Sequence, residues 1–476
     1  MGIRTGSEFI ESLRDERVVY VNGERLTDVT TYPPFQGILA TLASLYDLNH
    51  ERRAELTFPS PADGAPVALS FLKAASLAQV EQRLRAEEIR AEYTFGLMGR
   101  LPDFCNAYVT DLAVAAEYLG QRDPRFGHNA IRYWEQCRDS DLCLTHTLAD
   151  PQIDRSKGPA EQSDPFLTLR VVRETDSGVI VRGAKMLSTL APFANELYLG
   201  PFMPRSPGEE DYALAFALPC ATTGLKFICR EPYDAGRSQF DRPASSRFDE
   251  EDAVAIFDDV LVPWERVFIY RDIEIFNTAS HHTPGYRMLQ ALVRGAVKLK
   301  LLTGLAFHIA DAIGRSSALH IQAQLGELVA NTGMMEVLIH AGAQSAASDT
   351  HAALYQRSLA GALMILMPQF QARAVQTVRE LSGSGVIMTP TEKDFANPEI
   401  AGYLDRYLQG KGVSAKHRVQ LFKLAWDLVG EQFGSRQAQY EHFYAGDPYV
   451  NRARFYHSPV VQQYKALVTE LLNGKK

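Results

Sequence analysis

The 476-residue sequence contains little cysteine: there are five, at positions 105, 137, 143, 220 and 229. They are odd in number, and none stands in a CxxC or Cys/His pattern with the spacing of zinc ligands. We therefore expect free thiols in a reducing compartment, with neither a disulfide framework nor a metal site. No apolar run approaches the roughly 18 to 20 residues that a membrane span requires, and the N-terminus carries no apolar leader. The sequence thus predicts a cytoplasmic protein without a membrane partner.

Motifs for several common chemistries are also missing. The sequence has no Walker loop, no GxGxxG after a strand, no HExxH helix and no GxSxG turn, which argues against the usual nucleotide-phosphate loops, zinc peptidases and serine hydrolases. Lysine and arginine number 49 against 57 aspartates and glutamates, for a net charge of −8 without a long basic block. We expect no nucleic-acid partner, because phosphate-tracking surfaces are strongly basic.

The order of sequence periods predicts three parts. Residues 1–139 have mainly helical spacing, with one hairpin signal at Asn22-Gly23. From residue 140 to 272 the apolar period changes to two, as expected for strands. Residues 273–476 return to helical spacing, with Val297, Leu301 and Leu305 on one ridge, and end in a tail. The sequence predicts an α+β protein with a middle β domain between two helical domains.

The stretch DLCLTHTLADPQIDR, residues 141–155, contains the principal candidate residue, His146. Leu142, Leu144 and His146 alternate as in a half-buried strand, and Pro151 ends the pattern. A lone histidine at a strand end is more often structural than catalytic. Two other motifs reverse that balance: GRLPDF at residues 99–104 and SSRFDEEDA at residues 245–253.

These motifs form part of a longer pattern of seven clusters: VNGERLTDVTTYPPF (21–35), YTFGLMGRLPDF (93–104), LTHTLADPQIDR (144–155), VRGAKMLST (181–189), SSRFDEEDAVAIFDDVLVPWERVFIYRD (245–272), LQALVRGAVKL (289–299) and FGSRQAQYEHFYAGDP (433–448). In this order they resemble the flavin-dependent 4-hydroxyphenylacetate 3-monooxygenase family across nearly the whole chain. The resemblance implies an acyl-CoA dehydrogenase-like fold: an N-terminal helical domain, a middle β-barrel or sandwich and a C-terminal four-helix bundle. It also implies a homotetramer.

The resemblance implies the oxygenase component of a two-component monooxygenase. In that family FADH2 from a separate NAD(P)H:flavin reductase reacts with O2 to give a C4a-hydroperoxide, which hydroxylates a phenol, usually ortho to its hydroxyl. The absence of a Rossmann fingerprint agrees with this division, because the chain shows no nicotinamide site of its own. The substrate is expected to be a small aromatic compound, free or bound to a carrier.

Arg100 and His146 match the family's substrate-side arginine and histidine, and we expect both to be catalytic. A phenol becomes a better nucleophile as it approaches phenolate, which a fixed cation and a switchable imidazole both favour. Phe104 stands where the 4-hydroxyphenylacetate enzymes have tyrosine, so one hydroxyl is missing. A halogenated or nitrated phenol, already acidic enough to bind as phenolate, would need less help from a hydroxyl at this position. So would a substrate whose oxygen meets another hydrogen-bond donor.

Other expected contacts follow from the same resemblance and from loop character. On the substrate side, with Phe104, we expect Phe202, His281, His282 and Tyr286. On the FAD side we expect His146, Thr147, Asp150, Thr189, Ser246, Arg247, Gly385 and Arg436. Thr189 is placed at the flavin edge, and the last four are candidates for the pyrophosphate and adenosine, where a neighbouring subunit completes the site in related folds.

Several alternatives stay open. Hydroxylation could expel a halide or nitro group. An acyl-CoA dehydrogenase would need a glutamate base, for which no motif is visible. A lyase like 4-hydroxybutyryl-CoA dehydratase would hold an iron-sulfur cluster on three cysteines and a histidine, yet no cysteine follows Cys229 and no spacing marks such a cluster. A flavin-binding protein without catalysis is opposed by the presence of Arg100 and His146.

Overall fold

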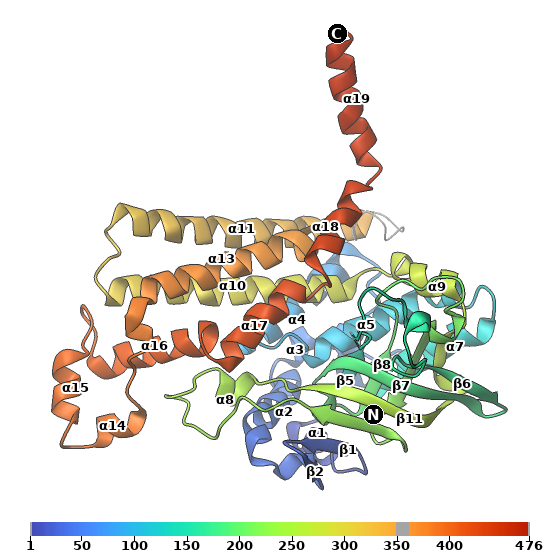
Figure 1. Ribbon diagram of the computed structural model, residues 1–476, viewed down its shortest axis with the longest axis horizontal. Coiled ribbons are helices and arrows are strands. Elements are labelled where there is room, and N and C mark those ends of the chain that lie inside the picture. The colour runs from blue at the N-terminus through green and yellow to red at the C-terminus, as the bar shows by residue number, and fades with distance from the viewer. Residues whose placement is uncertain (1, 152, 349–360, 475–476) are drawn as a thin grey trace.

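The computed structural model describes residues 2–151, 153–348 and 361–474. Helices come first along the chain, two β-sheets follow, and long helices complete the body (Figure 1). The first part contains α1 (Gly6–Glu11), β1 (Val18–Val21), β2 (Glu24–Leu26), α2 (Gln36–Glu51), α3 (Arg53–Leu56), β3 (Thr57–Pro59), β4 (Pro66–Ala68), α4 (Leu77–Tyr93), α5 (Pro102–Val114), α6 (Ala116–Leu119) and α7 (Pro124–Asp139).

The middle part is built of two larger sheets. Its elements are β5 (Leu144–Thr147), β6 (Arg170–Thr175), β7 (Gly178–Thr189), β8 (Glu196–Leu199), β9 (Leu214–Pro219), β10 (Leu225–Cys229), α8 (Ser245–Phe248), β11 (Asp252–Pro263) and β12 (Val267–Tyr270). One sheet has the order β2-β1-β10-β11-β7-β6 and the other the order β12-β9-β8-β5. The change to a period of two along the sequence is therefore a change to strands.

The N-terminal hairpin forms at the predicted turn, with Asn22 and Gly23 both at positive φ. Its place in the fold was not predicted. Strand β1 pairs in parallel with β10, with Val19 opposite Phe227, so the hairpin becomes one edge of the six-stranded sheet. Residues far apart in the sequence thus complete one β layer, and the start of the chain is joined to the middle part.

The expectation of a half-buried strand at His146 is wrong, because all four residues of β5 are buried. One edge of β5 pairs in parallel with β8, with His146 opposite Tyr198. Helix α5 and strand β7 also pack against β5. With neighbours on both faces, the strand has no solvent side, and its polar side chains must find partners inside the protein.

The last part is helical: α9 (Ile273–Thr278), α10 (Tyr286–Ala312), α11 (Leu319–Ser348), α13 (Met367–Ser382), α14 (Glu392–Ala396), α15 (Ala401–Tyr407), α16 (Ala415–Val429), α17 (Gln432–Phe443), α18 (Pro448–Tyr456) and α19 (Val460–Leu472). Helix α10 lies at the centre and packs against α4, α5, α11, α13 and α16. In Figure 1 α10, α11 and α13 run side by side, and α17 runs from α16 to α18. Helix α4, from the first part of the chain, therefore packs as a member of this bundle.

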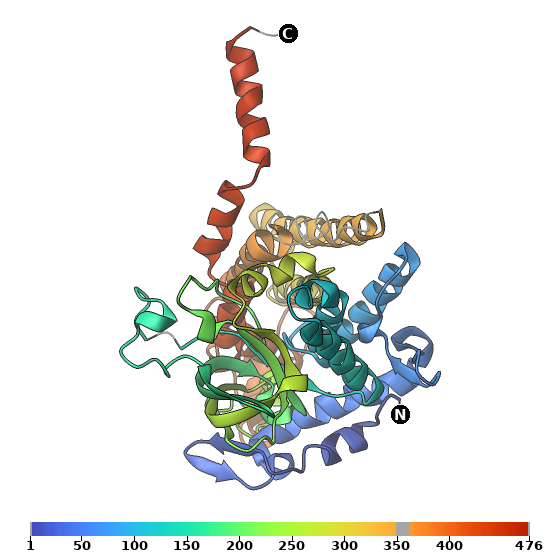
Figure 2. The same ribbon diagram turned by 90° about the vertical axis from the view of Figure 1, so that its right-hand side faces the viewer.

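Helix α19 projects away from the rest of the protein in both views (Figures 1 and 2). It has no buried residue, although it carries five large apolar side chains, at Tyr464, Leu467, Val468, Leu471 and Leu472.

All five cysteines are free thiols. Within the described ranges, no helix is both long and apolar enough to cross a membrane.

Candidate functional site

Arg100 lies in the short loop between α4 and α5, where all three parts of the chain meet. Its backbone N–H donates to Oε1 of Glu250 at 2.5 Å, which ties the loop to the residues before β11. The guanidinium carbon of Arg100 lies 4.3 Å from the ring centre of Phe104 and 4.3 Å from that of Tyr444. The Arg100 guanidinium thus lies close to two aromatic rings that are nearly perpendicular to each other, a favourable setting for a guanidinium.

His146 approaches the same Phe104 ring from β5. The two ring centres are 5.5 Å apart, and the ring of Tyr108 lies 6.0 Å from His146. Both imidazole nitrogens are buried and lack a hydrogen-bond partner within the described structure. Burial, together with the positive charges of Arg100 and Arg287, holds the pKa of His146 well below its usual range. The imidazole is therefore neutral at pH 7, with one nitrogen able to donate and the other to accept.

Helix α17 supplies two tyrosines that the sequence interpretation did not single out, Tyr440 and Tyr444. Arg436, Tyr440 and Tyr444 follow at intervals of four, so they share one helix face, and this spacing was the available signal. A Cβ at Gly99 would sit 2.2 Å from the Tyr440 ring, so only glycine allows this approach next to Arg100. The guanidinium carbon of Arg100 lies 5.3 Å from the Tyr440 ring centre.

Arg100, Phe104, His146, Tyr440 and Tyr444 together form what we call the Arg100–His146 cluster. Four of its polar atoms are buried without a partner among the described residues: Nε of Arg100, both nitrogens of His146 and the Tyr440 hydroxyl. Buried polar groups are normally hydrogen-bonded, and exceptions call for an explanation. An aromatic ligand with its own donors and acceptors, such as a phenol or an isoalloxazine ring, would satisfy these atoms. The residues present therefore fit both a flavin and a phenol.

Two carboxylates next to β11 connect this cluster to the predicted FAD-side residues. Arg436 contacts Glu250 through Nη1 at 3.0 Å and Asp252 through Nη2 at 2.7 Å. The Thr189 hydroxyl donates to Oδ1 of Asp252 at 2.7 Å, and Glu250 accepts the N–H of Arg100. Arg436 thus clamps α17 to the β layer, and a contact between Arg436 and FAD stays a prediction.

The strand-side candidates have partners of their own. The Thr147 hydroxyl donates to the Met186 carbonyl at 3.3 Å. Asp150 forms ion pairs with Lys185 and, at 2.7 Å, with Arg205. The Thr189 carbonyl accepts a hydrogen bond from the Thr145 hydroxyl at 2.6 Å, and the contacts of Thr147, Asp150 and Thr189 with FAD stay predictions.

The remaining FAD-side candidates lie on separate elements. The Ser246 hydroxyl donates to the Arg242 carbonyl at 2.5 Å, and the Arg247 guanidinium carbon lies 4.6 Å from the Phe248 ring centre. A Cβ at Gly385 would lie 3.1 Å from the Phe422 ring, which places this glycine against α16. No recorded contact joins these three to the Arg100–His146 cluster within the described residues, so their role in binding FAD stays a prediction.

The substrate-side candidates other than Phe104 are also dispersed. Phe202 is 40% exposed and lies beside Gly446, two residues after Tyr444. His281 and His282 are exposed, and the ring of His282 stacks on that of Tyr118 at 3.5 Å. The Tyr286 hydroxyl accepts the Ala74 N–H at 3.0 Å. The recorded contacts of the described residues bring none of these four to His146, and their contact with substrate stays a prediction.

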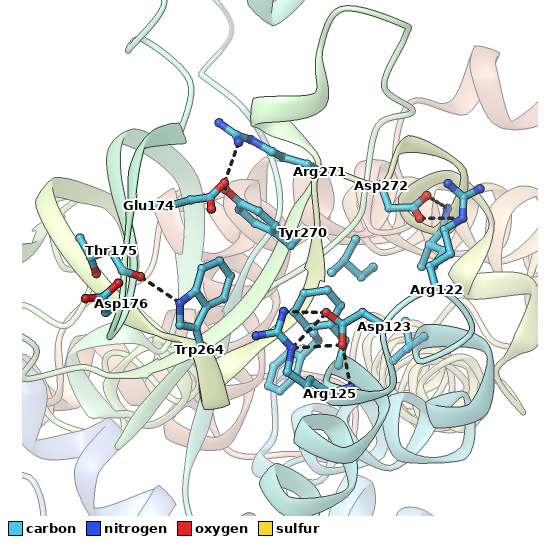
Figure 3. Close-up of a pocket in the computed structure, with 15 residues that line it drawn as sticks. Arg122, Asp123, Arg125, Glu174, Thr175, Asp176, Trp264, Tyr270, Arg271 and Asp272 are labelled. Atoms are coloured by element: carbon cyan, nitrogen blue, oxygen red, sulfur yellow. Dashed lines mark hydrogen bonds and ion pairs between the residues drawn. The ribbon is translucent and has the colours of Figure 1, made fainter.

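A cavity of about 570 Å³ lies elsewhere, between the start of α7, the end of β6 and strand β12. Figure 3 shows that charged residues line it in pairs, such as Arg122 with Asp272 and Arg125 with Asp123. Trp264 donates to the Thr175 carbonyl at 3.0 Å. Its lining residues include no member of the Arg100–His146 cluster. These paired groups make the cavity a poorer candidate than the unpartnered atoms around His146.

Comparisons with known proteins agree with this geometry. The fold is that of the acyl-CoA dehydrogenase-like proteins: the chain superposes with a TM-score of 0.85 on a 4-hydroxybutyryl-CoA dehydratase from N. maritimus, at 23% identity over 100% of this chain and 95% of that chain. Residues 5–269 match the family model "4-hydroxyphenylacetate 3-hydroxylase N terminal" and residues 275–473 match "4-hydroxyphenylacetate 3-hydroxylase C terminal". The chain belongs to the 4-hydroxyphenylacetate 3-hydroxylase family.

Relatives within this family are similar over their full length. The 4-hydroxyphenylacetate 3-monooxygenase oxygenase component of Thermus thermophilus is 37% identical, covering 98% of this chain and 97% of the relative. A crystal structure of such an oxygenase component, complexed with FAD and 4-hydroxyphenylacetate, has a TM-score of 0.91 at 36% identity, covering 99% of this chain and 100% of that one. The predicted family and fold, and the class of FAD-dependent aromatic monooxygenase, are confirmed.

Proposed function

We propose that this chain hydroxylates a phenol, ortho to its hydroxyl group, using O2 and FADH2 from a separate NAD(P)H:flavin reductase. The observation that carries the proposal is the convergence of Arg100 and His146 on the ring of Phe104, with Nε of Arg100 and both nitrogens of His146 buried and unpartnered among the described residues. A cation and a neutral imidazole at one apolar surface are the groups that a phenol needs to become a nucleophile.

When bound, reduced FAD supplies the electrons that activate O2, so that one oxygen atom can be transferred to the phenol ring. The chain provides the charge control on the other side of the reaction. Arg100 places a permanent positive charge where the phenol oxygen becomes phenolate-like, and the acceptor nitrogen of His146 can accept a hydrogen bond from the phenol hydroxyl. Burial and the charges of Arg100 and Arg287 lower the pKa of His146, so the imidazole stays neutral at pH 7 and keeps this acceptor nitrogen.

Shielding from water is the second task of the cluster. Phe104 is buried, and Tyr440 and Tyr444 close the other side of the Arg100 guanidinium. A water-free pocket strengthens the attraction between phenolate and guanidinium and limits the loss of activated oxygen as hydrogen peroxide. We infer that Phe202, whose ring lies near Gly446, covers this side of the substrate site.

The identity of the phenol depends on Phe104, which offers packing but no hydrogen bond. Phenols with electron-withdrawing substituents need less help to ionise, so halogenated or nitrated phenols are candidates beside 4-hydroxyphenylacetate. With such substrates, hydroxylation at the substituted carbon would expel the halide or nitro group. A carrier-bound phenol is the remaining candidate form.

We also infer a homotetramer in the cytoplasm. Tyr464, Leu467 and Leu471 follow on one face of α19, with Val468 and Leu472 beside them, and each is at least 58% exposed. An apolar stripe on a projecting helix is stable in water when a second copy of the chain covers it. Light scattering should give four chains per particle, and a variant ending at residue 459 should give fewer; an unchanged mass would contradict this role of α19. Five free thiols support a reducing location.

The proposed activity is tested by mass spectrometry of products from a panel of phenols, incubated with this protein, FAD, NADH and any flavin reductase. We expect one added oxygen in at least one phenol, and product only when the reductase is present. NADH oxidation at enzyme-like rates by this chain alone would contradict the two-component assignment. A reaction without this protein is the control for chemical oxidation by hydrogen peroxide.

A further inference from the structure

Two aromatic rings on helix α5, those of Phe104 and Tyr108, lie near His146. They are four residues apart and therefore lie on one helix face. Their ring centres are 5.5 and 6.0 Å from that of His146 and 6.4 Å from each other. Only Tyr108 has a polar atom to offer. It is also half-buried, whereas Phe104 and His146 are buried.

The surroundings of Tyr108 keep its phenol protonated. Burial raises its pKa, and the nearby Arg287 guanidinium only partly opposes that effect. Arg287 lies 4.9 Å from the Tyr108 ring centre and is neutralised by Asp111, whose Oδ2 is 2.7 Å from Nη1. A protonated phenol is a hydrogen-bond donor at pH 7. Tyr108 therefore offers a hydrogen-bond donor beside the acceptor nitrogen of His146.

Tyr108 is also firmly positioned. The ring of Tyr198 packs behind it with the centres 4.9 Å apart, and Arg287 covers its face. Tyr198 is the residue opposite His146 in the β5–β8 pairing, so the ring that supports Tyr108 is fixed by the strand pair that also fixes His146. Both groups are consequently held in one frame, as hydrogen-bonding to a single ligand atom requires.

We propose that the Tyr108 hydroxyl donates a hydrogen bond to the phenol oxygen of the substrate, next to His146, while Phe104 contributes only packing. This inference deepens the proposed function and rests on it. A hydroxyl at position 108 lies one helical turn, about 5.4 Å, from one at position 104. A substrate oxygen bound by Tyr108 therefore lies further along α5 than one bound by a tyrosine at position 104. This displacement changes the space available to the other substituents of the substrate ring.

The experiment uses 4-nitrophenol as a probe, because its visible absorbance reports whether the bound phenol is ionised. Wild-type enzyme loaded with oxidised FAD is titrated with the probe across a pH series, beside Tyr108→Phe and a matched control, Tyr133→Phe. Tyr133 is a buried tyrosine away from His146, and its hydroxyl donates to Glu196 at 3.4 Å. The dissociation constant and the apparent pKa of the bound probe are the readouts, and they require no turnover.

Loss of one hydrogen bond to a charged oxygen should raise the dissociation constant of the probe about tenfold or more in Tyr108→Phe, with the apparent pKa of the bound probe moving up. Tyr133→Phe should resemble wild type, and binding of FAD should be equal in all three proteins. Equal probe affinity and equal apparent pKa in wild type and Tyr108→Phe would overturn the inference. Failure of wild type to hydroxylate any phenol in the product assay would instead overturn the proposed function, so the two failures are distinguishable.

Discussion

The guanidinium of Arg436 on α17 holds the carboxylate of Asp252, the first residue of β11, at two points: Nη2 to Oδ1 at 2.7 Å and Nε to Oδ2 at 3.0 Å. Nη1 reaches Glu250 at 3.0 Å, and Glu250 accepts the backbone N–H of Arg100. One buried group of charges therefore connects the C-terminal helices, the β layer and the loop that carries Arg100. The geometry around the substrate depends on contacts that belong to none of the three parts alone.

Arg436→Ala should destabilise the protein strongly, because it leaves Glu250 buried without its cation and Asp252 with Arg230 alone. Breaking a buried ion pair on one side typically costs about 3 to 5 kcal/mol. Urea unfolding of the purified enzyme measures the change. Arg182→Ala is the matched control, since Arg182 pairs with Asp259 at the surface and its loss should leave stability nearly unchanged. Equal midpoints for both variants would show that the Arg436 clamp contributes little.

Arg100→Ala should lower hydroxylation by about 100-fold or more, since the charge that stabilises the phenolate is lost. Arg100→Lys should recover little, because a compact ammonium lacks the planar, multiply donating guanidinium that packs near Phe104 and Tyr444. Product formed per minute is measured with saturating FADH2. Arg122→Ala, at the mouth of the separate cavity in Figure 3, should match wild type. Near-normal product from either Arg100 variant would reduce Arg100 to a charge at the start of a helix.

The sequence predicted the features that depend on local pattern. The Asn22-Gly23 turn and the ridge of Val297 and Leu301 both follow from spacing that neighbouring residues determine. Arg100 and His146 were found because each stands in a distinctive motif. Their meeting at one phenylalanine follows from the packing of α5 on β5, which no local pattern shows.

The parts that the sequence did not predict depend on long-range packing. Tyr440 joins Arg100 across more than 300 positions, and only because Gly99 leaves room for its ring. The burial of β5 depends on α5 and β7 covering it, and alternation along the strand could not show this. The ion pairs of Arg436 with Asp252 and Glu250 are of this long-range kind, and the contact of Arg436 with FAD stays a prediction.

Glu251 should make the protein less stable as the pH rises. It is 1% exposed, neither carboxylate oxygen has a hydrogen-bond partner in the described structure, and burial raises its pKa to about 9. In the unfolded chain a glutamate ionises near pH 4.3. Between these values the folded state binds one more proton than the unfolded state, so its stability decreases as the pH rises from about 5 to 9.

Glu251→Gln keeps the shape of the protonated side chain and removes this titration. Melting temperatures measured from pH 5 to 9 should fall less steeply for Glu251→Gln than for wild type, with the variant gaining most at the alkaline end. Parallel curves for the two proteins would mean that Glu251 is already ionised in the folded state.

The most direct test of the account is to count hydroxylated phenol and hydrogen peroxide per FADH2 oxidised, with ¹⁸O2, in wild type and His146→Ala. Wild type should place labelled oxygen in the phenol. His146→Ala should still consume O2 and FADH2 but release peroxide, with product formation lowered about 30-fold or more, as expected for losing a catalytic hydrogen bond worth about 2 to 4 kcal/mol. A His146→Ala enzyme that forms labelled product as efficiently as wild type would contradict the assignment of the active site to this histidine.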